Sequence, residues 1–152
     1  MKHLLLIILI SLLLLSSPVN GNNHKGETLY RWGEKPDYKW MGFGDKETQL
    51  KYIGEVNNGK PNGLGIEISP DGRKYVGSWV YGKQNGQGTF IYLNGDKYEG
   101  KWKDGKQDEG THTWKDGEKY FGRWKDGKPW NGTKNDKNGN FLHKRVNGKT
   151  IK

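Results

Sequence analysis

Few residues of this 152-residue sequence have the types and spacing that chemistry requires. The adjacent carboxylates Asp108-Glu109 would point to opposite faces of a strand, which makes them poor acid–base partners. Cysteine, a phosphate-binding G-x-x-x-x-G-K-[ST] loop and a G-x-S-x-G motif are all absent from the sequence. We therefore expect no catalytic site, no metal and no cofactor. The histidines lack metal-ligand spacing and are expected at the surface: His3, His24, His112 and His143.

The composition favours a thin β-structure with many tight turns. Hydrophobic residues make up only 31%, which is too few for a thick two-layer core. Aromatic residues nevertheless reach 12%, and 24 residues are glycine, so the chain does not resemble a disordered one. Without cysteine, the fold must be held by packing and hydrogen bonds alone.

The net charge of +9 is concentrated near the C-terminus. Residues 123–152 contain nine Lys or Arg and two Asp, whereas residues 22–122 carry a net charge of only about +1. This basic end is either a solvated end of the chain or a contact for an anionic surface. The candidate contact residues are Lys134, Lys137, Lys144, Arg145 and Lys149.

The first 21 residues are predicted to be a secretory signal peptide. Leu4 to Leu15 is apolar except for Ser11, and this run is too short for a membrane-spanning helix, which needs roughly twenty residues. Cleavage is expected after Gly21, with an uncleaved anchor as the alternative. Either way, we expect an exported protein, periplasmic or secreted. Export also makes nucleic acid an unexpected partner, although aromatic residues alternate with lysines.

A repeat of 22 to 23 residues organises the chain after residue 51. A tyrosine opens each unit, a glycine follows two positions later, and Trp follows at four positions in all units but the first, which has Val56. Asn-Gly or Asp-Gly pairs then recur where the chain should turn. The strand glycines are Gly54, Gly77, Gly100 and Gly122. The aromatic column consists of Tyr52, Tyr75, Trp79, Tyr98, Trp102, Tyr120 and Trp124.

Each unit is predicted to form two short antiparallel strands. In the second unit, Tyr75 to Trp79 alternates as a strand, residues 82–86 form a loop, and residues 88–92 form the second strand. A glycine between Tyr and Trp leaves a gap, over which rings of the neighbouring hairpin are expected to lie flat. The aromatic column would then be a stacked ladder, which is either only the core of the thin sheet or also a binding groove. Trp114 and Trp130 lie off this ladder and are candidates for stacking on a sugar or a partner residue.

The pattern Y-x-G-x-W-x-x-G-x-x-x-G-x-G, followed by G-x-x-Y, resembles the MORN (membrane occupation and recognition nexus) repeat family. The second unit matches it in full, from Tyr75 to Tyr98, and the resemblance covers about residues 52–139. The third and fourth units are one residue shorter between their loop glycines. The resemblance implies an elongated, single-layer antiparallel β-meander with a shallow groove. It also implies roles in protein contact, dimerisation or membrane association rather than catalysis.

The predicted organisation has four parts. Residues 1–21 are the signal peptide, and residues 22–51 are an N-terminal cap in which Gly42-Phe43-Gly44 ends a decayed repeat. Residues 52–141 are an array of about four repeats, and residues 142–152 are a degenerate strand and a basic tail. The strand is expected over residues 141–146 and a polar tail over residues 147–152.

The expected function is that of an all-β, non-catalytic, exported interaction module. A single-layer sheet leaves one face uncovered, and an unknown partner protein or a second copy of the chain would cover that face. The alternative is a peripheral protein of the cell envelope that binds an anionic membrane or polysaccharide through its basic C-terminal end.

Overall fold

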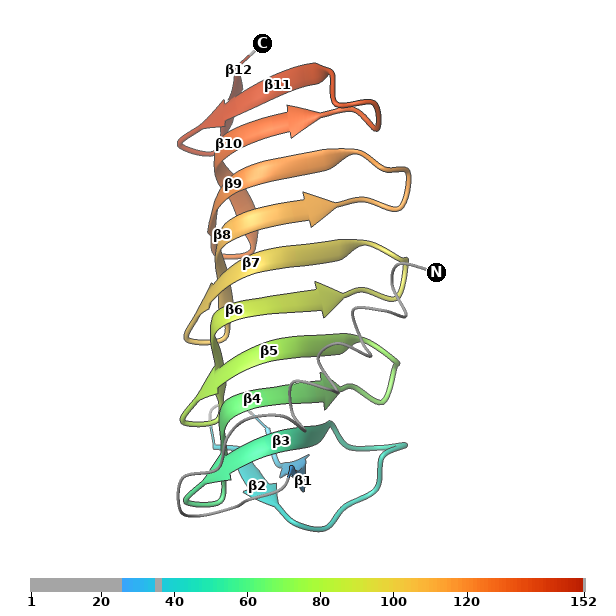
Figure 1. Cartoon of the computed structure of the whole chain (residues 1–152), viewed down its shortest axis with the longest axis vertical. Helices are drawn as coiled ribbons and strands as arrows, with labels where there is room; N and C mark the ends of the chain where they lie inside the picture. Colours follow the sequence, from blue (N-terminus) through green and yellow to red (C-terminus); the bar gives the residue numbers. More distant parts are fainter. Residues whose placement is uncertain (1–25, 35–36, 152) are drawn as a thin grey trace, which may run out of the picture.

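The part of the chain that the structure describes folds into one open antiparallel sheet, as the repeat pattern predicted, and this sheet has twelve strands. A computed structural model describes residues 26–34 and 37–151, so the predicted signal peptide lies outside the described residues. Within that part of the chain no segment forms a helix that could cross a membrane. The hairpins stack along the long axis of the molecule in sequence order (Figure 1). The strands are β1 (Glu27–Trp32), β2 (Lys39–Met41), β3 (Lys51–Asn57), β4 (Lys60–Ile68), β5 (Lys74–Val80), β6 (Lys83–Ile91), β7 (Lys97–Lys103), β8 (Lys106–Thr113), β9 (Lys119–Lys125), β10 (Lys128–Asn135), β11 (Phe141–Val146) and β12 (Lys149–Ile151).

Two kinds of turn alternate along the sheet. Two-residue turns connect the two strands of each hairpin, from β3–β4 to β11–β12. Both turn residues have positive φ, as in Asn58 (50°) and Gly59 (68°). We call these turns the hairpin tips. Longer loops connect one hairpin to the next, and each closes with a glycine, such as Gly95, whose N–H donates to the carbonyl of Tyr92 at 3.1 Å. The Asn-Gly and Asp-Gly pairs that predicted turns all lie in one of these two kinds.

The predicted loop over residues 82–86 is wrong. The turn consists only of Tyr81 and Gly82, and β6 begins at Lys83 rather than at Gly88. The chain can continue as a strand because Gly86, with a φ of 89°, forms part of a β-bulge. The bulge takes up the residues that looked like loop in the sequence.

The shorter third and fourth repeats have smaller bulges. In the second repeat three residues of β6 lie opposite Ser78, whereas in the third only Asp108 and Glu109 lie opposite Lys101. The missing residue of the shorter repeats therefore changes only the bulge. The hairpin tip and the pairing of the following glycines are unchanged, and Gly110 still lies opposite Gly100.

The two ends of the sheet extend beyond the repeats. At the N-terminal end, β1 lies between β3 and β2. At the C-terminal end β11 has the predicted range, and the polar tail adds a further strand: Lys149–Ile151 forms β12, antiparallel to β11. The tail folds back because Asn147-Gly148 forms one more two-residue tip.

The core is a zigzag of tyrosine and tryptophan rings on one face of the sheet. Trp102 contacts Tyr75 of the preceding hairpin and Tyr98 of its own strand, with ring centroids 5.1 and 5.3 Å apart. The interplanar angles are 80° and 90°, so the rings meet edge to face and are not stacked flat as expected. Edge-to-face contact is favoured because the positive edge of one ring meets the negative face of the next. The same geometry relates Trp79 to its two tyrosines.

In each repeat the tyrosine of the same hairpin, not of a neighbouring one, lies over the strand glycine or over the glycine paired with it. A Cβ on Gly77 would lie 2.5 Å from Cα of Gly88 and 2.6 Å from the hydroxyl of Tyr75. That hydroxyl donates to the carbonyl of Ser78 at 3.0 Å. The bond recurs from Tyr52 to Glu55, Tyr98 to Lys101 and Tyr120 to Arg123. Tyrosine is thus required for its hydroxyl as well as its ring, because phenylalanine would leave that bond unmade.

Val56, which replaces Trp in the first repeat, is compensated from outside the array. Trp40 of β2 contacts Tyr52 at 6.0 Å and Trp79 at 6.2 Å between ring centroids. Trp40 thus adds an aromatic ring to the core beside the first repeat, where position 56 supplies only valine.

The buried tyrosines make the fold sensitive to alkaline pH. Burial raises the pKa of Tyr52, Tyr75, Tyr98 and Tyr120, because each phenolate would lose its hydration. The unfolded chain releases these protons near pH 10, before the folded chain does. The free energy of unfolding should therefore fall above pH 10, by about 1.4 kcal/mol per pH unit for each tyrosine involved.

Thermal melts across this pH range, read by circular dichroism together with phenolate absorbance, test the prediction. The exposed Tyr81 supplies the control, because Tyr81→Phe should leave the pH profile unchanged. Ionisation of all eight tyrosines well before unfolding would contradict it.

Candidate binding groove

A groove of about 780 Å³ runs along the aromatic face of the sheet. Much of its lining comes from equivalent positions of the second and third repeats, and the segment before the first repeat adds Arg31, Tyr38, Trp40 and Leu50. Trp79 and Trp102 form one such pair, and Gln84 and Gln107 form another. Phe90 and Tyr92 complete the floor beside them.

The floor of the groove combines aromatic rings with fixed amides. Gln107 donates from Nε2 to the hydroxyl of Tyr92 at 2.9 Å, and Gln84 donates from Nε2 to Oε1 of Glu67 at 3.4 Å. Burial raises the pKa of Tyr92, although the bond from Gln107 opposes the change. The floor can thus offer apolar contact and hydrogen bonds at once, as ligand grooves do.

The rim of the groove is charged, with both signs represented. Lys106 and Asp126, from neighbouring hairpin tips, form an ion pair at 3.0 Å. Arg73 and Lys83 also line the groove. Because the signs are mixed, the groove does not select a strongly charged ligand.

His112 is buried rather than at the surface, contrary to the expectation from sequence. Its Nε2 lies 3.3 Å from Oδ2 of Asp96, and its ring contacts Tyr92, Trp114 and Trp124. Burial opposes ionisation of Asp96, but hydrogen bonds, led by the Lys115 backbone N–H, lower its pKa. The pair fills the position that Phe90 occupies one repeat earlier. Nowhere in residues 26–34 and 37–151 do three metal-ligating side chains gather.

The candidate basic residues do not form one surface. Lys134 lies opposite Tyr120 and Arg145 opposite Gly132, which places both on the aromatic face. Lys144 and Lys149 lie on the other face, and Lys137 is in the loop before β11. Lys134 is further engaged in an ion pair with Glu118.

Trp114 and Trp130 are half-buried, and a lysine already lies over one face of each ring. The Lys134 ammonium lies 4.4 Å from the ring centroid of Trp114, and the Lys125 ammonium lies 4.5 Å from that of Trp130. Of the aromatic column, Tyr52, Tyr75, Trp79, Tyr98, Trp102 and Tyr120 are buried, and Trp124 is half-buried. Only Trp79 and Trp102 of this column line the groove.

Phe90, Tyr92, Gln84 and Gln107 were missed as groove residues by the sequence analysis. Their signal was available, because Gln84 and Gln107 occupy one column of the repeat. Gln84 lies within residues 82–86, which were predicted to be a loop, and a loop assignment does not indicate which face of the sheet a side chain occupies.

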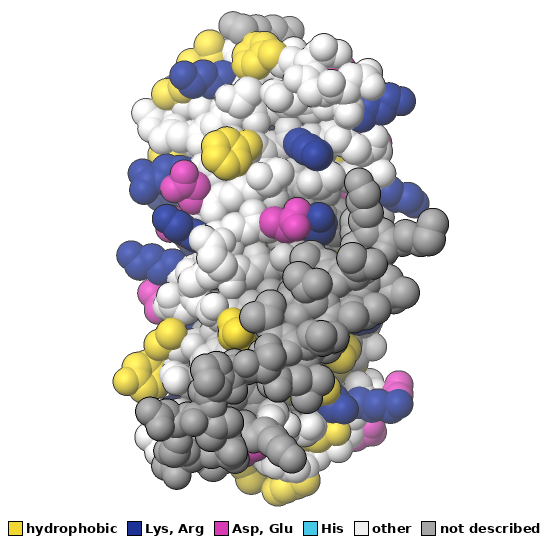
Figure 2. Space-filling view, in the orientation of Figure 1, with side chains coloured by type: hydrophobic (Ala, Val, Ile, Leu, Met, Phe, Trp, Pro, Cys, Tyr) yellow, Lys and Arg dark blue, Asp and Glu magenta, His cyan; other side chains and the backbone are white. Residues whose placement is uncertain are grey.

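On the opposite face of the sheet, the exposed hydrophobic side chains of the described residues are scattered. In Figure 2, which shows one face of the molecule, exposed hydrophobic side chains are separated from one another over the part that the structure describes. Phe121, 62% exposed, lies opposite Thr111 and Thr133 on the face away from the tyrosines. Scattered single hydrophobic residues are ordinary surface and do not indicate a binding site.

Comparison with known proteins agrees with the fold. The MORN repeat model matches four segments, residues 52–72, 75–97, 98–119 and 120–130, which together cover half of the chain. None of the curated proteins compared matches the chain significantly. MORN repeats are generally associated with protein or membrane binding and are typically non-catalytic. With its period, its Tyr-x-Gly-x-Trp strands and its stacked hairpins in agreement with this match, the chain belongs to the MORN repeat family.

Proposed function

We propose that this chain is a non-catalytic, exported module that binds a protein partner, or a second copy of itself, through the groove. The observation that carries the proposal is the groove itself, with a floor of Trp79, Trp102, Phe90 and Tyr92. Aromatic side chains that combine apolar area with a polar tip are the groups that most often dominate protein interfaces.

The shape and chemistry of the groove favour a polypeptide occupant. The floor supplies apolar contact together with the amides of Gln84 and Gln107, which suits a chain with alternating side chains and peptide groups. Phe90 and Tyr92 are only half-buried and supply most of the accessible aromatic surface, whereas Trp79 and Trp102 are almost fully buried beneath the groove.

Site-specific photo-cross-linking tests this proposal. A cross-linking residue in place of Tyr92 lies in the groove, whereas one in place of Phe121 lies on the opposite face. Products with an envelope protein or a second copy are expected from position 92 and not from position 121. They should persist at high salt, because a packed aromatic interface is not screened. Products from position 121 alone would contradict the proposal.

Export is part of the same proposal and has a direct test. The apolar run from Leu4 to Leu15 and the small residue Gly21 predict a mature protein that begins at Asn22. Mass spectrometry of the native protein should find this N-terminus in the periplasmic or secreted fraction. A soluble cytoplasmic protein that retains Met1 would contradict export.

A contact with an anionic membrane or polysaccharide is the second candidate function. The excess of basic residues supports it. Its proposed location at the C-terminal end is weakened, however, because Lys134 and Arg145 lie on one face, and Lys144 and Lys149 on the other.

A further inference from the structure

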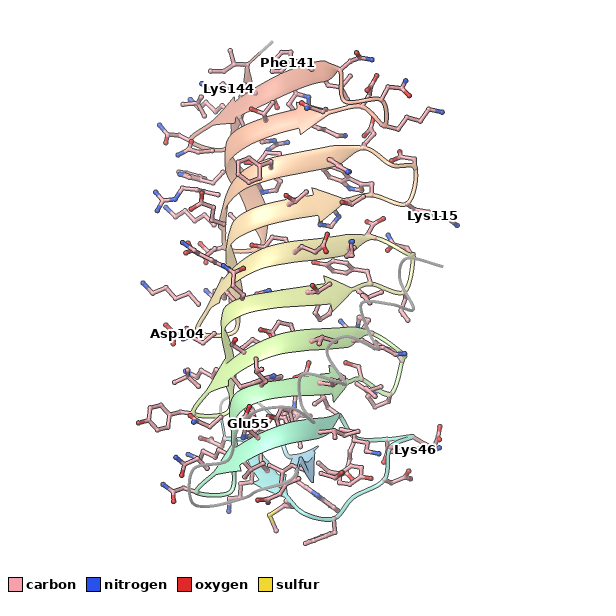
Figure 3. All side chains as sticks on the ribbon, in the orientation of Figure 1. Lys46, Glu55, Asp104, Lys115, Phe141 and Lys144 are labelled. Atoms are coloured by element: carbon pink, nitrogen blue, oxygen red, sulfur yellow. The ribbon has the colours of Figure 1, made fainter. Side chains whose placement is uncertain are left out.

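The hairpin tips form one long edge of the sheet, opposite the edge formed by the longer loops. In Figure 3, Asp104 marks the tip edge and Lys115 the loop edge, on opposite sides of the molecule. The tips are Asn58-Gly59, Tyr81-Gly82, Asp104-Gly105, Asp126-Gly127 and Asn147-Gly148.

A lysine follows the glycine of every tip. Because successive tips are two strands apart, these lysines recur about every 9.5 Å, over a line of roughly 38 Å. All five side chains are exposed: Lys60, Lys83, Lys106, Lys128 and Lys149. We call this set the tip lysine row.

Positive charge is segregated to this edge. Each tip, taken with one flanking residue on either side, has a formal charge of +1, so the five tips together carry +5. In the third tip Lys103 and Lys106 outweigh Asp104, and the fourth tip has the same arrangement. The four loop segments, residues 69–74, 92–97, 114–119 and 136–141, together carry only +1, because acidic residues balance most of their lysines.

Backbone hydrogen bonds hold the tips in line. The N–H of Gly82 donates to the carbonyl of Pro61 at 2.8 Å, and that of Gly105 donates to the carbonyl of Gln84 at 2.9 Å. Gly148 repeats the bond at the C-terminal end. The backbone anchors of the row are thus fixed before any ligand arrives, which lowers the entropy cost of binding.

We propose that the tip lysine row binds a linear anionic polymer, such as a polysaccharide that carries sulfate, phosphate or carboxylate groups. A straight row of exposed, evenly spaced cations is complementary to an extended chain of anions. A membrane surface is less suited, because every turn residue at the tips except Tyr81 is Asn, Asp or Gly and cannot insert into a bilayer. This site lies at the hairpin tips. Lys83 and Lys106 of the row also stand at the rim of the groove, so the row is tested with a polyanion and not with a protein partner.

Binding to dextran sulfate, with neutral dextran as the blank, tests this site. The tip variant carries Lys83→Gln, Lys106→Gln and Lys128→Gln. The matched control carries Lys74→Gln, Lys115→Gln and Lys119→Gln on the loop edge, so both variants lose the same charge. All six lysines are exposed, and the near-ultraviolet circular dichroism of both variants should match that of the parent protein.

The tip variant should bind dextran sulfate roughly a hundredfold more weakly at low salt, and the control should bind within a few-fold of the parent. The dependence of log affinity on log salt should become shallower by about 2 for the tip variant, since three counterion-releasing contacts are removed. Equal losses in the two variants would overturn the proposal, because net charge rather than the row would then determine binding. Binding to anionic phospholipid vesicles without binding to dextran sulfate would overturn it as well.

Discussion

Replacement of Trp102 by alanine is expected to lower the free energy of unfolding by about 3–5 kcal/mol, as deletion of a buried aromatic side chain does. Trp102 is only 7% exposed and joins two hairpins, through Tyr75 on one side and Tyr98 on the other. Its indole N–H also donates to the carbonyl of Gly88 at 3.3 Å. The variant therefore loses contacts between neighbouring repeats, and the energy of these contacts is what makes a repeat array fold cooperatively.

Denaturant melts of Trp102→Ala beside Trp130→Ala measure this effect. Trp130 is half-buried at the bulge of the last repeat, and the Lys125 ammonium lies over its ring. Its loss should cost less than about 2 kcal/mol. Equal shifts of the two midpoints would contradict the role of Trp102 as a bridge between hairpins.

The repeat pattern predicted the fold because it contains both the two-residue alternation of a strand and the 22- to 23-residue spacing of the hairpins. Alternation within Tyr75-x-Gly77-x-Trp79 indicates a strand, and the Gly-containing turns repeat at fixed intervals. Hairpins pair with their sequence neighbours, so the order of strands follows directly from the order of repeats. The contacts of one hairpin then recur in all of them.

Details that depend on bulges and on side-chain direction could not be predicted in this way. Gly86 looks like a loop residue because it is flanked by polar residues and glycine, but in the structure it is a bulge within β6. In the second repeat Gln84 pairs with Trp79 and Gly88 with Gly77, so both stay on the aromatic face. In the third repeat the smaller bulge places Gln107 and Gly110, three residues apart, on that same face, and period-2 reasoning does not carry across such a step.

The candidate basic site could not be located from charge alone. A sum over residues 123–152 gives a basic end, but strand alternation distributes those residues over two faces. The lysine after each tip glycine was visible as a column in the sequence. Its significance depends on the sheet, because only stacking in order turns a column into a row along one edge.

Replacement of Gly100 by valine should destabilise the protein by about 3 kcal/mol or more, at the upper end of overpacking effects, although valine has the better strand propensity. A Cβ at this position would overlap the carbonyl oxygen of Glu109 and lie 2.5 Å from Cα of Gly110. Both are backbone atoms of β8, so no side-chain rotation relieves the contact. The strands would have to separate where Gly100 pairs with Gly110, which would also disturb the ring of Tyr98 above them.

Gly42→Val is the matched control, because a Cβ on Gly42 meets nothing within 4 Å and the residue is exposed. This variant should stay within about 0.5 kcal/mol of the parent protein in urea melts, as surface substitutions usually do. In this account, the close packing of paired glycines allows the tyrosine rings to cover the sheet. Gly100→Val should therefore melt at a temperature well below that of Gly42→Val. Equal melting temperatures would mean that the strands can separate at no cost, and that the glycines are not required for the approach of the rings.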